Sequence, residues 1–123
     1  MGIQYESNPL EMRKLVLNYT DAATDKFIAT VPKDCYLTIC RVVIITPFNA
    51  AGSDLLKFGL GVGGSSLGIN LDLSQAAGTI IDKQLTALQS SPFTTNRDMY
   101  ALYTYTSTAP TAGKAIIEFG WYF

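Results

Sequence analysis

Apolar and polar residues alternate along most of this chain, as they do in β-strands that are buried on one face. Leu37–Phe48 has the strongest strand character, because the β-branched run Val42–Ile45 favours extended backbone. Its period of two slips at Cys40-Arg41, which predicts a β-bulge or a strand that is covered on both faces. Pro47 has no amide hydrogen to donate, so regular pairing should end near Thr46.

Shorter segments with the same alternation lie on both sides of this strand, and turn-forming residues separate them at intervals of about 8 to 14 residues. Thr79–Gln89 fits either a helix of three turns or a short strand followed by irregular structure, and the second interpretation is favoured. Ser90–Asp98 is expected to be an exposed loop. The other predicted strands are Leu15–Tyr19, Lys26–Val31, Leu56–Val62, Ile69–Leu73, Tyr100–Thr106 and Lys114–Phe123.

Seven or eight strands with at most one short helix predict an all-β protein, an antiparallel β-sandwich. We favour a jelly roll over an immunoglobulin-like sandwich, because the strand count is near eight and the Cys, Trp, Cys pattern of immunoglobulin domains is absent. Leu37–Phe48 and Lys114–Phe123 are predicted to be inner strands. Met1–Met12 has no clean period and contains Asn8-Pro9, so we expect an extended N-terminal arm before one sandwich domain, residues 13–123.

The amino-acid composition argues against nucleic-acid binding and favours association with other protein chains. Only 15% of the 123 residues are charged and the formal net charge is −1, so the chain offers no basic surface for nucleic acid. A weakly charged surface resists self-association poorly, which favours an oligomer or a component of an assembly. The first residues do not form a secretory signal pattern, and no apolar run reaches the roughly 18 residues of a membrane span. A soluble protein is therefore expected.

The sequence lacks the usual catalytic and metal-binding residues. It contains no histidine, which removes the common general base and the common transition-metal ligand. Cys35 and Cys40 do not form a zinc site, and their spacing on one strand places them on opposite faces, so we predict two thiols and no disulfide. We expect no catalytic residues, no cofactor and no metal, and hence no enzyme.

Two weaker motifs have structural explanations. Gly59–Gly64 matches the G-x-G-x-x-G string of dinucleotide-binding proteins, but no helix start follows it, so we attribute these glycines to close packing in a strand. Two pairs of carboxylates are candidate sites for sugar hydrolysis or calcium binding, but their spacing supports neither role. These pairs are Asp72 with Asp82 and Asp21 with Asp25.

The order of the segments resembles the capsid decoration, or cement, proteins of tailed bacteriophages. The likeness spans Val31–Phe123. It rests on Leu37–Phe48, Asn49, Gly52, the FGLGVGG segment, Ile69–Leu73, Ala77-Gly78-Thr79, the tyrosine-rich strand and Gly113–Phe119. The resemblance implies a small jelly-roll or similar β domain, often a homotrimer, that sits outside the capsid and bridges subunits of the major capsid protein. It also implies synthesis in the host cytoplasm and a final location on the virion exterior.

If the chain binds a capsid, the candidate contacts are in the arm and in the aromatic strands near the C-terminus. They are Ile3, Tyr5, Pro9, Leu10, Tyr103, Tyr105 and Tyr122. A phage tail or head-to-tail connector component and a receptor- or carbohydrate-binding tail module are the alternatives, because exposed aromatic residues also suit those roles.

Overall fold

A computed structural model describes residues 10–60, 69–84 and 93–122 of the chain, and these residues form eight β-strands and one 3-10 turn. The fold is therefore all-β, as predicted. The elements are β1 (Leu10–Asn18), η2 (Tyr19–Asp21), β2 (Asp25–Val31), β3 (Tyr36–Thr46), β4 (Asp54–Leu60), β5 (Ile69–Asp72), β6 (Ile80–Gln84), β7 (Arg97–Tyr105) and β8 (Lys114–Tyr122).

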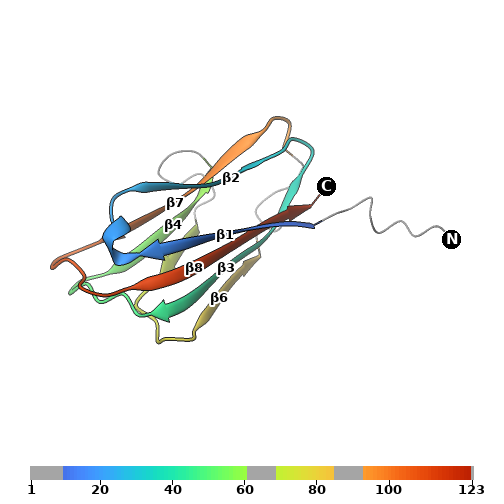
Figure 1. Ribbon diagram of the computed structural model, residues 1–123. Coiled ribbons are helices and arrows are strands. Elements are labelled where there is room, and N and C mark those ends of the chain that lie inside the picture. Colours follow the sequence, from blue (N-terminus) through green and yellow to red (C-terminus); the bar gives the residue numbers. More distant parts are fainter. Residues whose placement is uncertain (1–9, 61–68, 85–92, 123) are drawn as a thin grey trace.

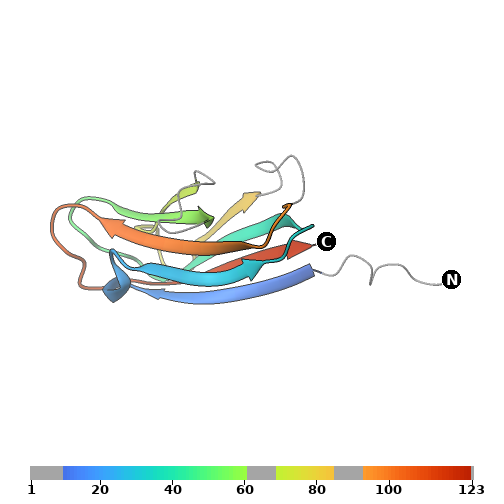
Figure 2. The ribbon, with the colours of Figure 1, turned by 90° about the horizontal axis from the view of Figure 1, so that it is seen from above.

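The strands pair as a nested set, β1 with β8, β2 with β7, β3 with β6 and β4 with β5, and every pair is antiparallel. Additional pairing of β3 with β8 and of β4 with β7 joins them into two four-stranded sheets, ordered β1-β8-β3-β6 and β2-β7-β4-β5. This is the strand order of a jelly roll, an antiparallel hairpin rolled up into a sandwich. Figure 1 looks onto the β1-β8-β3-β6 sheet, and Figure 2 shows the molecule from above.

The strand predicted to be central is central. β3 and β8 occupy the two inner positions of their sheet, as expected. The register of β3 against β8 shifts between Leu37 and Ile39 and again between Ile44 and Thr46, so β3 contains irregularities of the bulge type. Neither shift falls at Cys40-Arg41, where the pairing with β8 is continuous, so the predicted position of a bulge is wrong. β3 ends at Thr46, directly before the proline that cannot donate to a ladder.

The core lies between the sheets and is formed by alternate residues of each strand. In β8 the inward residues are Ala115, Ile117, Phe119 and Trp121, all buried, which confirms the predicted apolar face of the last strand. The aromatic side of β7 also points inward, because Met99, Ala101 and Tyr103 are buried. The other core side chains include Leu17, Val31, Leu37, Val42, Ile44, Phe48, Leu56 and Leu73.

One carboxylate is buried in this core. Asp54, at the start of β4, is only 2% exposed. The Tyr103 hydroxyl donates a hydrogen bond to its Oδ1 at 2.5 Å, and the amide of Ala50 donates to Oδ2 at 3.1 Å. Burial raises the pKa of the Tyr103 phenol far above its usual value, and the hydrogen bond to Asp54 raises it further, so the phenol remains a donor. The ring of Phe48 packs edge-on against Tyr103 with centroids 4.8 Å apart.

The loops beside this pair are tied together by short polar contacts. Asn49 accepts hydrogen bonds from the amides of Thr111 and Ala112 at 2.8 and 3.1 Å, which joins the β3–β4 loop to the β7–β8 loop. Gly113 has a φ of +152°, and a Cβ placed there would lie 2.5 Å from the ring of Phe48. A side chain at this position would therefore collide with the core.

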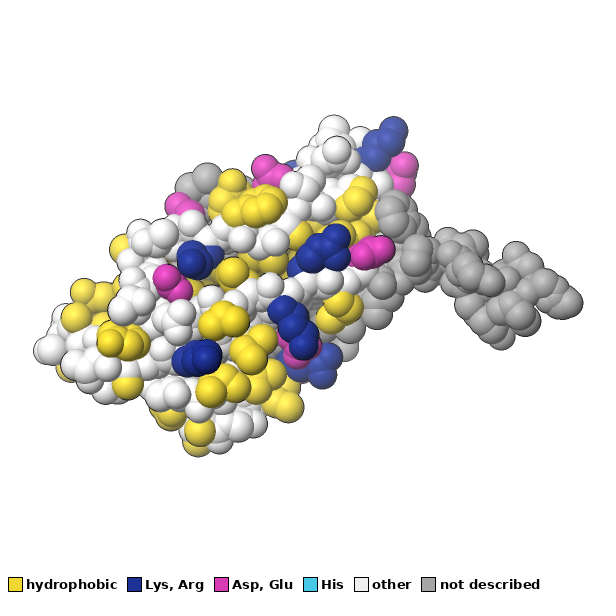
Figure 3. Space-filling model, viewed as in Figure 1, with side chains coloured by type: hydrophobic (Ala, Val, Ile, Leu, Met, Phe, Trp, Pro, Cys, Tyr) yellow, Lys and Arg dark blue, Asp and Glu magenta, His cyan; other side chains and the backbone are white. Residues whose placement is uncertain are grey.

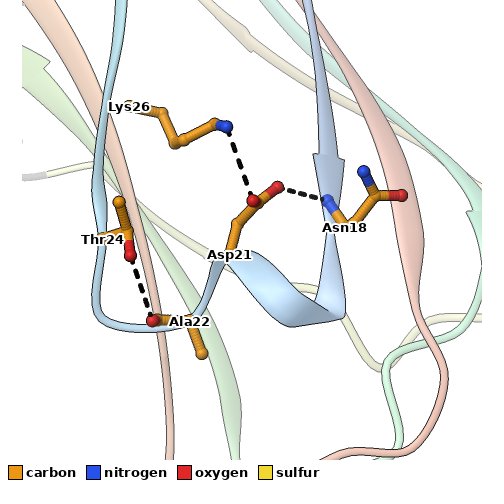
Figure 4. Close-up of polar contacts among 5 residues, drawn as sticks. All are labelled: Asn18, Asp21, Ala22, Thr24 and Lys26. Atoms are coloured by element: carbon orange, nitrogen blue, oxygen red, sulfur yellow. Dashed lines mark hydrogen bonds and ion pairs between the residues drawn. The ribbon is translucent and has the colours of Figure 1, made fainter.

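The turn between β1 and β2 uses one of the candidate carboxylates for structure. Asp21 accepts a hydrogen bond from the amide of Asn18 at 2.8 Å, and its other oxygen lies 3.4 Å from Nζ of Lys26 (Figure 4). The Asp21 carboxylate thus holds the short 3-10 turn against the start of β2.

Three predicted boundaries need correction or completion. β1 begins at Leu10, so Leu10–Met12 belong to the sandwich and not to the arm, because they continue the ladder with β8. Arg97 and Asp98 lie in β7 and not in a loop. Within Thr79–Gln89, Ile80–Gln84 is the strand β6, which confirms the favoured interpretation for that part. Residues 85–89 of that segment, residues 1–9 of the arm and residues 61–64 of the glycine motif lie outside the described residues.

Candidate interaction surface

The described residues contain no group of three or more His, Cys, Asp or Glu side chains that would hold a metal ion. Nor do they contain a helix with the length and apolar character of a membrane span. Asp72 and Asp82 are not brought together, because Asp72 is in β5 and Asp82 is in β6 of the other sheet. Asp72 instead accepts hydrogen bonds from the amide and hydroxyl of Ser74 at 2.9 and 2.6 Å.

The predicted contact residues occupy very different places. Tyr103 is fully buried, so its prediction as a surface contact is wrong: the side chain points inward to bind the Asp54 carboxylate. Tyr105 is 37% exposed. Tyr122 is half-buried and stacks on Tyr36, with ring centroids 5.8 Å apart and an interplanar angle of 22°. Leu10 is the first residue of β1 and pairs with Tyr122, whereas Ile3, Tyr5 and Pro9 lie outside the described residues.

Tyr122 belongs to the outer face of the β1-β8-β3-β6 sheet, which we call the front face. Because the inward residues of β8 have odd numbers, Ile116, Glu118 and Tyr122 point outward. The register then places the outward residues of the four strands in rows across the sheet. Figure 3 shows this face, with yellow apolar side chains beside blue and magenta charged ones.

One row is entirely apolar. Val16 of β1 lies opposite Ile116 of β8, Ile116 lies opposite Val43 of β3, and Val43 lies opposite Ile80 of β6. Val16 is 46% and Ile80 58% exposed, while the two inner residues are half-buried by their neighbours. We call these four residues the apolar row. An antiparallel sheet that faces water normally carries polar residues on that side, so a continuous apolar row indicates a binding surface.

The next row, two residues along each strand, is entirely charged and alternates in sign. Lys14 lies opposite Glu118, Glu118 opposite Arg41, and Arg41 opposite Asp82. Nζ of Lys14 lies 3.8 Å and Nε of Arg41 3.5 Å from the Glu118 carboxylate. We call these four residues the charged row. Glu118 is the more buried partner in both pairs, and cross-strand ion pairs of this kind add up to about 1 kcal/mol each to stability.

The outer face of the other sheet has a smaller apolar feature. Phe27 of β2 is 50% exposed and meets the edge of Tyr100 of β7, with ring centroids 5.7 Å apart. Tyr100 in turn lies opposite Gly59 of β4, which fits the expectation that a glycine in this strand permits close packing. The row beside it is mixed, since Asp25, Leu102, Lys57 and Asn70 follow one another across the sheet.

Cys35 supplies no reactive group to either surface. Its side chain is buried, and the residue lies directly before β3, so the expectation that Cys35 and Cys40 share one strand is wrong. Burial raises the pKa of the thiol, and the adjacent negative charge of Asp34 raises it further, which disfavours the nucleophilic thiolate. The absence of a disulfide between Cys35 and Cys40 stays a prediction, because the side chain of Cys40 is not described.

No model of a protein family matches the chain, and no curated protein matches it either. Its fold is similar to that of a chain in the acidic stable capsid structure of Helicobacter pylori bacteriophage KHP30. The TM-score is 0.68, and the match covers 93% of this chain and 87% of that chain. The two sequences are 8% identical over this match, so the likeness demonstrates a shared fold.

Sequence reasoning missed both rows of the front face. It selected residues of the arm and tyrosine side chains as contacts, although all four members of the apolar row are isoleucine or valine residues. The signal was present as apolar residues on both faces of Val42–Ile45 and at Ile116-Ile117. Only the register shows that these residues align with Val16 and Ile80 in one line across the sheet.

Proposed function

We propose that this chain is a structural protein of a phage virion that binds the outside of the capsid and stabilises it by bridging subunits of the major capsid protein. The observation that carries the proposal is the jelly roll that the chain shares, over 93% of its length, with a chain in the structure of a phage capsid. The resemblance of the segment order to decoration proteins supports the same role.

The role requires binding surface and no catalytic group, cofactor or metal. An exposed apolar row supplies such surface, since completing the burial of a half-exposed valine or isoleucine contributes about 1 kcal/mol. Contacts of this size are weak singly, but a capsid presents many equivalent positions, so linked copies reinforce one another. A homo-oligomer is therefore part of the proposal, and the resemblance to decoration proteins favours a trimer.

Attachment to the shell is assigned to the N-terminal arm and the strand end from which it leaves. Leu10 pairs with Tyr122 at this end of the sheet, so the start of β1 lies beside the last described residues of β8 (Figure 1). Ile3, Tyr5 and Pro9 of the arm, together with Leu10 and Tyr122, are the proposed capsid contacts.

The location can be tested by immunogold electron microscopy of purified virus particles, with antibody raised against this chain. Label over the shell supports the proposal. Label confined to the tail or neck supports the alternative of a tail, connector or receptor-binding component, and unlabelled particles contradict a virion role.

The arm can be tested separately with a variant that lacks residues 1–9. This deletion ends directly before β1, whereas a longer deletion that removes Glu11 also removes strand residues paired with Tyr122 and Trp121. We expect an unchanged melting temperature and weaker binding to particles stripped of this protein. Unchanged binding by the truncated variant contradicts the assignment of the arm.

A further inference from the structure

We propose that the front face binds the front face of a second copy of this chain, through a two-fold axis that lies between the two sheets and runs parallel to the strands. The proposal concerns contact between copies, and it does not depend on the capsid role. Its basis is the order of signs in the charged row and the position of that row beside the apolar row.

The charged row is complementary to itself in this arrangement. From β1 to β6 its signs are plus, minus, plus, minus, carried by Lys14, Glu118, Arg41 and Asp82. Rotation by 180° about an axis along the strands reverses the order of the strands and keeps each row at its own level. Lys14 then faces Asp82 of the second copy, and Glu118 faces Arg41 of the second copy. Each residue of the charged row thus meets an opposite charge, and each contact occurs twice.

The same rotation brings the apolar rows together. Val16 faces Ile80 of the second copy, and Ile116 faces its Val43, so the exposed parts of these side chains leave water in one step. A two-fold axis perpendicular to the strands is disfavoured. With that axis along the charged row, Lys14 would face Lys14 and Glu118 would face Glu118, and like charges in contact oppose association.

The size of the face indicates a weak contact. β1, β8 and β3 are paired over about 30 Å and β6 over about 17 Å, so at a spacing of about 4.8 Å the face measures about 500 Å². Stable interfaces bury about 800 Å² per partner, so we expect reversible, concentration-dependent association. Packed sheets differ in direction by about 30°, and the long side chain of Lys14 on the edge strand β1 can span the resulting offset to Asp82 of the second copy.

This contact joins copies in pairs and cannot by itself form a trimer. A chain that makes only this contact is a dimer. If a separate three-fold contact also forms, the complete assembly has six copies, because each member of one trimer pairs with a member of another.

The proposed contact can be tested by exchanging the charges of one residue on each edge strand of the front face. Within one copy Lys14 and Asp82 lie on the opposite edge strands β1 and β6, separated by about 14 Å, so they do not form an ion pair with each other. In the proposed pair they are neighbours. We expect Lys14→Glu and Asp82→Lys each to weaken association at least about fivefold, since each variant creates two like-charge contacts. The double variant should recover most of the loss.

The measurement is sedimentation equilibrium of the purified full chain over a range of concentrations, with melting temperatures recorded for every variant. Ile80→Ser removes part of the apolar row and should weaken association. Phe27→Ser is its matched control, because Phe27 is similarly exposed on the opposite sheet and should leave association unchanged. Recovery in the double charge variant, with melting temperatures near that of the wild type, supports the two-fold contact. A monomer at all concentrations, an isolated trimer, or losses that simply add in the double variant overturn it.

Discussion

Replacement of Tyr103 by phenylalanine should destabilise the protein far more than the loss of one oxygen atom suggests. The Tyr103 hydroxyl donates to the carboxylate of Asp54, which is 2% exposed. Among the described residues, the amide of Ala50 supplies the other donor to this carboxylate. Phenylalanine keeps the ring packed against Phe48 but leaves one carboxylate oxygen short of a donor. A hydrogen bond to a charged group contributes about 1.5–3 kcal/mol, so we expect a loss of about 2 kcal/mol.

For a domain of this size, a loss of about 2 kcal/mol lowers the melting temperature by about 6–10 °C. Circular dichroism at neutral pH will measure this, and urea unfolding will give the free energy. Tyr105→Phe is the matched control, because Tyr105 lies two residues along the same strand and is partly exposed. That control should change stability by less than about 0.5 kcal/mol.

A double-mutant cycle with Asp54→Asn separates the hydrogen bond from packing. When the acceptor is a neutral amide, removal of the Tyr103 hydroxyl should cost only about 1 kcal/mol, because the hydrogen bond is no longer charge-assisted. A Tyr103→Phe melting temperature within about 2 °C of the wild type, or equal costs in both backgrounds, would refute the reasoning.

Three further outcomes are expected. Gly113→Ala should lower the free energy of unfolding, measured with urea, by about 2–4 kcal/mol, because φ is +152° and the new Cβ meets the ring of Phe48. Gly78→Ala should lower it by only about 1 kcal/mol, because φ is +86° but the space around the new Cβ is open. Hydrogen bonds from Ser74 hold the pKa of Asp72 below its ordinary value of 3.8, so their stabilisation is present above that pH and is lost as the pH falls through the lowered pKa. The stability difference between the wild type and Asp72→Asn should therefore shrink on acidification. Two thiols should react with a thiol reagent in the denatured protein, and burial should make Cys35 react much more slowly in the folded protein.

The sequence predicted only part of the candidate interaction surface. Alternation correctly divided β7 and β8 into two sides, but it did not say which aromatic side chains face the core. In β2 it placed Phe27 on one side with Ala29 and Val31, whereas a register shift after Phe27 leaves that ring exposed and the other two side chains buried. Tyr103 was expected on the surface, and it is buried because a carboxylate 49 positions earlier in the chain receives its hydroxyl. Tyr122 was expected on the surface and lies on the front face.

The sequence by itself determined the strands and most of their ends. β-branched residues, period-two alternation and the turn residues act locally, so β3 ends before Pro47 and β8 carries its apolar residues inward, as the pattern alone predicts. Only the tertiary structure decided which strands are neighbours and in what register. Lys14, Glu118, Arg41 and Asp82 are scattered over more than 100 positions of the chain, and nothing in their local surroundings predicts that they alternate along one line. The charged row exists because the nested set of antiparallel strands rolls up and places β8 between β1 and β3. Pairing between strands so distant in the chain depends on the burial of the whole core and not on any single segment.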